Sequence, residues 1–152
     1  MKNTFVFLAF VAFVTISLSF NLQEDPWKVP EKYINMKNPV KADAASIKAG
    51  KEIYNEHCYS CHLYGKGDGP KAASLNYSPT DLTTASFQKQ TDGELFYKIY
   101  YGHNDMPGFK NRIPDNDDAI ENEFGVTRGP GDLINYIRTL NKSEKQTRTT
   151  GL

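Results

Sequence analysis

The stretch Cys58-Tyr59-Ser60-Cys61-His62 constrains this chain more than any other feature, because it contains the only two cysteines. A C-x-x-C-H pattern is typical of a site where haem is attached covalently. Each thiol can add to one vinyl group of the porphyrin, and the two intervening residues let both sulfurs reach the same porphyrin edge. The histidine that follows then lies against the iron as its proximal ligand. The sequence therefore predicts one covalent haem c held by Cys58, Cys61 and His62.

Three other uses of the cysteines fit the sequence less well. A structural zinc ion takes about four ligands, and His57 and His103 do not supply a second ligand pair. A redox-active C-x-x-C pair sits where a strand meets a helix, and no strand pattern precedes Cys58. A disulfide between Cys58 and Cys61 would close a loop too short to stabilise the fold much.

An apolar, uncharged stretch runs from Thr4 to Leu22. The apolar part of a signal peptide has about 7–15 residues and a membrane-spanning helix about 20, so residues 1–22 fit either a signal peptide or an N-terminal membrane anchor. Ser17-Leu18-Ser19 resembles a cleavage site and favours the signal peptide. Both alternatives place the rest of the chain in the periplasm or on the outer face of the cytoplasmic membrane, where apocytochromes c receive haem.

The remaining chain is long enough for one domain and too short for two ordinary ones. The 18 basic and 18 acidic side chains of the whole sequence balance, and no basic patch indicates a nucleic-acid partner. Residues 23–42 are rich in proline and are predicted to be an extended lead-in. Its Trp27 and Tyr33 either lie against the domain or belong to a mobile tether. Residues 141–152 are polar and are predicted to form a fraying tail, which leaves residues 43–140 as the domain.

Two helices are predicted at the ends of this domain. Asp43 is a candidate N-cap for a helix that reaches His57, because its apolar residues recur at steps of three and four. A similar pattern follows Asp132. Gly50 would allow a close approach between the two helices, so they are expected to cross at Gly50 and Tyr54.

A third helix is predicted where Thr91 and Glu94 have the spacing of a capping box. Apolar residues follow at helical spacing, and Gly102 is placed to end the helix. The glycines and prolines of residues 65–79 predict a loop before it, with Leu82 and Phe87 facing inward.

Met106 is the candidate for the second axial ligand, because it lies in a loop just beyond this third helix. The chain has three methionines; Met1 belongs to the export segment and Met36 to the lead-in. A thioether sulfur is a soft ligand for haem iron. His103 is the competing candidate, and it would give a haem with two histidine ligands and a lower reduction potential. A methionine without such a role is core filler.

The C-Y-S-C-H string, the Gly65-to-Pro70 loop, the helix after Thr91 and the Asp105-Met106-Pro107 sequence together resemble a small monohaem class I c-type cytochrome. The resemblance is to the bacterial periplasmic or membrane-attached type, and it spans roughly residues 43–140. It implies an all-α cytochrome c fold, with three or more helices around one haem and with crossing N- and C-terminal helices. It also implies that the carbonyl of Pro70 accepts a hydrogen bond from the His62 ring.

The sequence departs from that family's pattern in two places. Family members usually carry glycine directly after the motif, whereas this chain has Leu63, so a small rearrangement of the turn is expected. The stretch from Asp115 to Gly131 is longer than usual and contains an acidic run between Asp115 and Glu123. The positions of glycine and glutamate required by a calcium loop are not met, so this run is interpreted as a solvated loop.

These features predict an electron carrier rather than an enzyme, because two axial ligands leave no open position on the iron. The donor and acceptor would be other redox proteins. Two alternatives remain open, a haem-bearing subunit of a larger respiratory or oxidoreductase complex, and a ligand sensor or enzyme in which the methionine is displaced.

Overall fold

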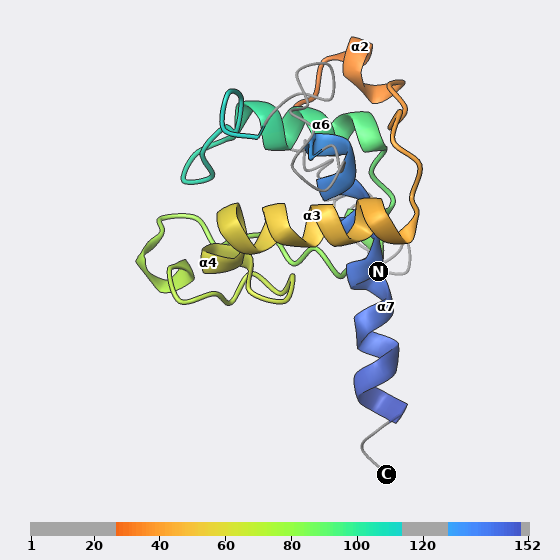
Figure 1. The fold of residues 1–152 in the computed structure, drawn as a ribbon. Helices are drawn as coiled ribbons and strands as arrows, with labels where there is room; N and C mark the ends of the chain where they lie inside the picture. Colours follow the sequence, from red (N-terminus) through yellow and green to blue (C-terminus); the bar gives the residue numbers. More distant parts are fainter. Residues whose placement is uncertain (1–26, 114–127, 150–152) are drawn as a thin grey trace, which may run out of the picture.

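The computed structural model describes residues 27–113 and 128–149, which form helices joined by loops without a strand. Figure 1 shows their arrangement; the elements are α2 (Glu31–Ile34), α3 (Ala44–His57), α4 (Tyr59–His62), the 3₁₀ turn η1 (Ala72–Ser74), α5 (Ala85–Gln88), α6 (Asp92–Tyr101) and α7 (Pro130–Thr149). The prediction of an all-α fold is confirmed. Residues 1–22 and the acidic run from Asp115 to Glu123 lie outside the described residues. Among the described helices, none is long and apolar enough to cross a bilayer.

The crossing of α3 and α7 organises the fold (Figure 1). As predicted, α3 begins after Asp43, whose carboxylate accepts a hydrogen bond of 3.0 Å from the Ser46 amide. At the crossing, a side chain on Gly50 would collide with the backbone carbonyl of Asp132. The rings of Tyr54 and Tyr136 pack edge-on beside it, with centroids 5.1 Å apart. The predicted crossing at Gly50 and Tyr54 is therefore confirmed.

Both ends of α7 differ from the prediction. The helix begins at Pro130, because proline fits the first helical position and the Asp132 carboxylate accepts a hydrogen bond from the Gly129 amide at 3.0 Å. It continues to Thr149, although fraying was expected after Leu140. No proline or glycine interrupts that stretch and most of its residues tolerate a helix, so the backbone can remain helical where apolar periodicity has ended.

The third helix, α6, has the predicted capping box. The Glu94 amide donates to the Thr91 hydroxyl at 3.1 Å, and the Thr91 amide donates to the Glu94 carboxylate at 2.6 Å. The helix ends at Gly102, which has a φ of 68°. Leu95 and Ile99 are buried on its inner face.

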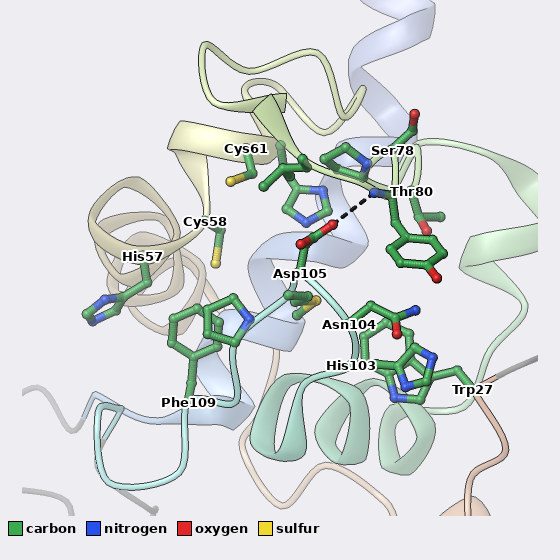
Figure 2. Close-up of a pocket in the computed structure, with 16 residues that line it drawn as sticks. Trp27, His57, Cys58, Cys61, Ser78, Thr80, His103, Asn104, Asp105 and Phe109 are labelled. Atoms are coloured by element: carbon green, nitrogen blue, oxygen red, sulfur yellow. Dashed lines mark hydrogen bonds between the residues drawn. The ribbon is translucent and has the colours of Figure 1, made fainter. Parts of the chain in front are cut away.

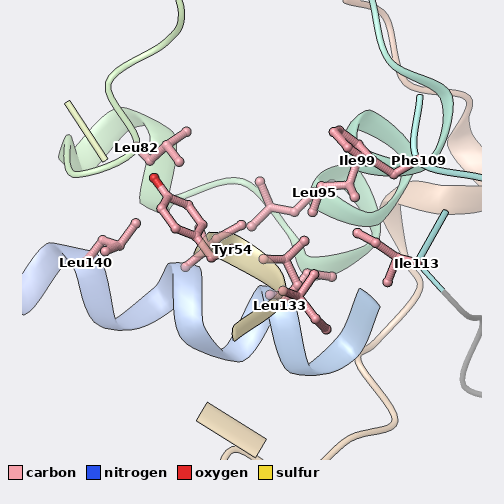
Figure 3. Close-up of a cluster of buried hydrophobic side chains, with 11 residues drawn as sticks. Tyr54, Leu82, Leu95, Ile99, Phe109, Ile113, Leu133 and Leu140 are labelled. Atoms are coloured by element: carbon pink, nitrogen blue, oxygen red, sulfur yellow. The ribbon is translucent and has the colours of Figure 1, made fainter. Parts of the chain in front are cut away.

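The hydrophobic core lies between α3, α6 and α7 (Figure 3), and burial of its apolar surface is the main force holding the fold together. Its members are Ile53, Tyr54, Leu82, Leu95, Ile99, Phe109, Ile113, Leu133, Ile134, Ile137 and Leu140. Leu82 faces inward as predicted, and Phe87 packs against the core from its edge. Because Cys58 directly follows α3, this core also fixes the position of the C-x-x-C-H segment.

Within the lead-in, residues 27–40 lie against the domain, and we call this segment the strap. It is not extended throughout, since α2 begins after Pro30; proline is compatible with a helix start. The Tyr33 ring packs on Tyr97 at 4.9 Å, and its hydroxyl hydrogen-bonds that of Tyr101 at 2.7 Å. The Asn38 amide donates to Gly131 carbonyl oxygen, 2.9 Å away. The strap is therefore attached to both α6 and α7.

Candidate haem site

The C-x-x-C-H segment forms one tight helical turn, α4, at the end of α3. Cys58 is the C-cap residue of α3 and the N-cap residue of α4. Its carbonyl accepts hydrogen bonds from the amides of Cys61 (3.2 Å) and His62 (2.9 Å). Both cysteines are free thiols. Figure 2 shows their side chains along one wall of a pocket.

The turn after His62 has the geometry of a glycine turn despite the leucine in it. Leu63 has φ 47° and ψ −121°, a backbone conformation that glycine adopts without strain. Leu63 therefore carries backbone strain in this turn. The following loop folds back on α4, where the Gly69 amide donates to the Cys61 carbonyl at 3.0 Å. A side chain on Gly69 would clash with the Ser60 and Cys61 backbone.

A cleft of two hollows, about 180 and 380 Å³, lies beside this turn. Cys58, His62 and Met106 line both hollows, and Cys61 and His103 line the first. The second hollow is floored by core side chains from α6, from α7 and from the loop before α5: Leu82, Leu95, Ile99 and Ile137. The cleft is therefore apolar, with sulfur and imidazole groups on its walls.

Burial changes the acid–base properties of the groups in α4. It raises the pKa of the Cys58 thiol to about 12, helped by the nearby Cys61. A redox-active thiol has the opposite property, a lowered pKa. Burial also lowers the pKa of His62, against a smaller opposing effect of the Thr80 backbone. Both groups are therefore uncharged at neutral pH.

The Nδ1 atom of His62 is buried and has no hydrogen-bond partner among the described residues. The bond to the Pro70 carbonyl that the family resemblance implies is thus not formed in this structure. Buried polar atoms are nearly always paired, so the His62 ring lacks the outer hydrogen bond that usually orients a metal-ligating histidine. The donor set and the apolar walls both fit haem.

The Met106 loop is fixed to the end of α6. His103 and Met106 exchange backbone hydrogen bonds of 2.9 and 3.0 Å across a tight turn. Side chains on Gly102 or Gly108 would collide with neighbouring backbone, so glycine at these positions allows the loop to pack closely. Beyond the turn, the Phe109 amide donates to a carbonyl of α6 at 3.0 Å. The loop is therefore held on both sides of Met106.

Sequence reasoning missed two residues at this cleft. The Asp105 carboxylate accepts a hydrogen bond of 2.8 Å from the Tyr77 amide, which ties the Met106 loop to the loop across the pocket (Figure 2). Trp27 lines both hollows and stacks on His103. Their contacts span the chain and leave no local pattern, although Trp27 is the only tryptophan. His57, which the sequence did not favour as a zinc ligand, lies half-buried against Phe109 with ring centroids 5.7 Å apart.

The family model of the cbb3-type cytochrome c oxidase subunit III matches residues 45–120, half of the chain. The chain belongs to this family of c-type cytochromes. The cytochrome resemblance inferred from the sequence is thus confirmed, and so is the all-α cytochrome c fold. A c-type cytochrome uses haem c and transfers electrons.

Among solved structures, the cytochrome is similar to a chain of the reducing HAO-like protein complex of Kuenenia stuttgartiensis. The sequences are 27% identical, the TM-score is 0.54, and the match covers 70% of this chain and 48% of the other. The cytochrome therefore spans about half the length of that relative. No curated protein matches the chain.

Proposed function

We propose that this cytochrome is an electron carrier with one haem c, attached through Cys58 and Cys61 and ligated by His62 and Met106. The observation that carries the proposal is that these four side chains, from α4 and from a loop more than forty residues later, line the same apolar cleft. The haem would supply an iron that cycles between Fe(II) and Fe(III). The protein would bind it, orient it and exclude water.

Met106 is preferred over His103 because it lines both hollows, whereas His103 lines one and has its ring stacked on Trp27. A loop held on both sides of Met106 also favours a closed, two-ligand iron over a sensor or enzyme with a displaceable methionine. Histidine and methionine ligation raises the reduction potential of a c-type haem.

The remaining sequence assignments complete this proposal. Residues 43–140 would form the haem domain, with 23–42 as its lead-in and 141–152 as a polar tail. Residues 1–22 would direct export to the periplasm or hold the protein at the outer face of the cytoplasmic membrane. Its electron donor and acceptor would be redox proteins.

A second candidate is a fixed subunit of a larger respiratory or oxidoreductase complex. The family description, a cytochrome c oxidase subunit, and the similar chain from a multi-protein complex both favour it. The two candidates share the same haem chemistry and differ in assembly. Gentle purification from membranes would separate them, since a subunit elutes with a larger complex and a carrier elutes alone.

The first prediction concerns attachment. The exported protein should carry the mass of one haem, and the haem should survive acid-acetone extraction because thioether bonds hold it. Cys58→Ala and Cys61→Ala should each lose one thioether, shift the reduced haem absorption and mature with lower yield. Ser60→Ala, a change between the two cysteines, is the matched control. Purified protein without covalent haem would contradict the proposal.

The second prediction concerns the axial methionine. Met106→Ala should abolish the absorption band of ferric iron bonded to sulfur, open the iron to external ligands and lower the reduction potential. His103→Ala is the control and should retain the band. The assignment would be wrong if His103→Ala lost these properties and Met106→Ala kept them.

A further inference from the structure

The strap brings Trp27 into the cleft from outside the region matched by the family model, which begins at residue 45. Its indole stacks on His103 with ring centroids 5.2 Å apart and an angle of 30° between the planes. In Figure 2 this pair lies at the end of the pocket opposite Cys58 and Cys61. Trp27 also lines both hollows together with Met106.

The position of the indole is enforced by the rest of the strap. The Lys98 ammonium of α6 lies 5.4 Å from the centroid of the Trp27 ring. A side chain on Gly93 would collide with the Tyr33 carbonyl, so the strap lies directly on α6. Further along, the Asn38 amide donates to the Asn135 side chain of α7 at 2.9 Å. Contacts on two helices offset the conformational entropy that fixing this segment costs.

His103 links the indole to Met106, because His103 and Met106 exchange backbone hydrogen bonds in one turn. An indole stacked on His103 thus packs against the element that carries the axial sulfur. The polarity and openness of the shell around a haem determine its reduction potential and its access to external ligands.

We propose that Trp27 is a positioning and shielding residue of the haem site, which closes the Met106 side of the cleft against water and small ligands. The inference rests on the proposed haem function and extends it to a residue of the strap. A thioether is a weak ligand, so an external base such as imidazole can replace Met106 when the loop moves. Imidazole would therefore favour the open conformation of the loop, whereas the contacts of the strap favour the closed one.

The test uses ferric holoprotein, and its first readouts are the haem mass and the iron–sulfur band of the unaltered chain. The Trp27→Ala variant should retain the haem mass and the iron–sulfur band. It should bind imidazole about tenfold more tightly, which is the smallest effect usual for residues that contact metal ligands. Its reduction potential should fall. Tyr64→Ala is the matched control, because Tyr64 is 68% exposed and lines neither hollow. Its imidazole affinity should equal that of the unaltered protein.

Two further measurements keep the test decisive if Trp27→Ala does not mature. Trp27→Phe should give an intermediate imidazole affinity. In the unaltered protein, imidazole should accelerate hydrogen exchange of the strap amides, because a ligand that opens the loop must loosen the strap by linkage.

The outcomes separate the two hypotheses. Unaltered protein without haem or without the iron–sulfur band would defeat the proposed function. If both are present, and the Trp27 variants bind imidazole like the unaltered chain with no change in strap exchange, the shielding role alone is overturned.

Discussion

At the residue scale, two residues near the proposed iron ligands have unusual backbone conformations. Leu63 and Asn104 have positive φ values of 47° and 51°, one directly after His62 and one in the Met106 turn. Such conformations cost free energy in residues other than glycine and persist where surrounding contacts enforce them. Here Leu63 directly follows the proposed ligand His62, and Asn104 lies two residues before the proposed ligand Met106.

Leu63 offers a direct test of this strain. Leu63→Gly should raise the free energy of unfolding by about 1 kcal/mol, because relief of an unfavourable φ exceeds the greater unfolded-state entropy of glycine. Leu63→Ala is the control, since alanine keeps the strained Cβ while removing the rest of the side chain. Denaturant unfolding of the holoproteins would measure both. Equal stability of the glycine and alanine variants would show that the turn is unstrained.

Prediction from sequence succeeded at this scale where the chemistry is local. Cys58, Cys61 and His62 are within one turn, so spacing alone indicates their joint use. The place of Trp27 depends on contacts with Lys98 of α6 and with His103, which lie more than seventy residues away along the chain. No local pattern encodes such a contact, and a surface position and a mobile tether were equally compatible with the sequence.

At the scale of elements, the site depends on how α3 meets α7. The buried Asn135 amide donates to Ser46 at 2.8 Å and to Val40 at 3.2 Å, so one side chain links the crossing to the strap. The Arg138 guanidinium donates to the Asp92 carboxylate at 2.7 Å and joins α7 to the start of α6. These bonds fix the three helices whose ends and inner faces surround the cleft.

The close approach at Gly50 gives the second structural prediction. Gly50→Ala should lower the free energy of unfolding by about 3 kcal/mol, because a methyl group would force the helices apart and this overpacking outweighs the better helix propensity of alanine. Lys51→Ala, an exposed change at the next position of α3, should stay within about 0.5 kcal/mol of the unaltered protein. Thermal unfolding would measure both variants. A stable Gly50→Ala protein would refute close packing at this crossing.

Helix bounds were predictable where a local sequence signal marks them. Asp43 and the Thr91 capping box are side-chain signals, and the structure begins α3 and α6 where they indicate. The end of α7 carries no such signal, and the helix persists after its apolar stripe stops. The turn α2 was missed because a four-residue helix depends on packing of Tyr33 rather than on its own sequence.

At the scale of the whole molecule, charge bears on how the cytochrome meets its redox partners. The 18 basic and 18 acidic residues cancel, yet five acids are concentrated between Asp115 and Glu123. A protein without net charge still has a negative electrostatic potential around an acidic segment. Such a potential changes the rate at which partners meet more than the stability of their complex. If the segment faces the route of electron transfer, a cationic partner would be attracted and an anionic one repelled.

Small oxidants of known charge test this last prediction without an identified partner. Oxidation of the ferrous protein by a cationic cobalt–phenanthroline complex should slow by about an order of magnitude as salt rises, because the Debye length shrinks to about 10 Å at 0.1 M. Oxidation by anionic ferricyanide should show the opposite trend or none. Asp117→Asn with Asp118→Asn should flatten the salt dependence for the cation, whereas Glu31→Gln, a change in the exposed part of α2, should have little effect. Stopped-flow rates that are independent of salt, or a double variant that behaves like the unaltered protein, would leave the acidic run a solubilising segment without a part in electron transfer.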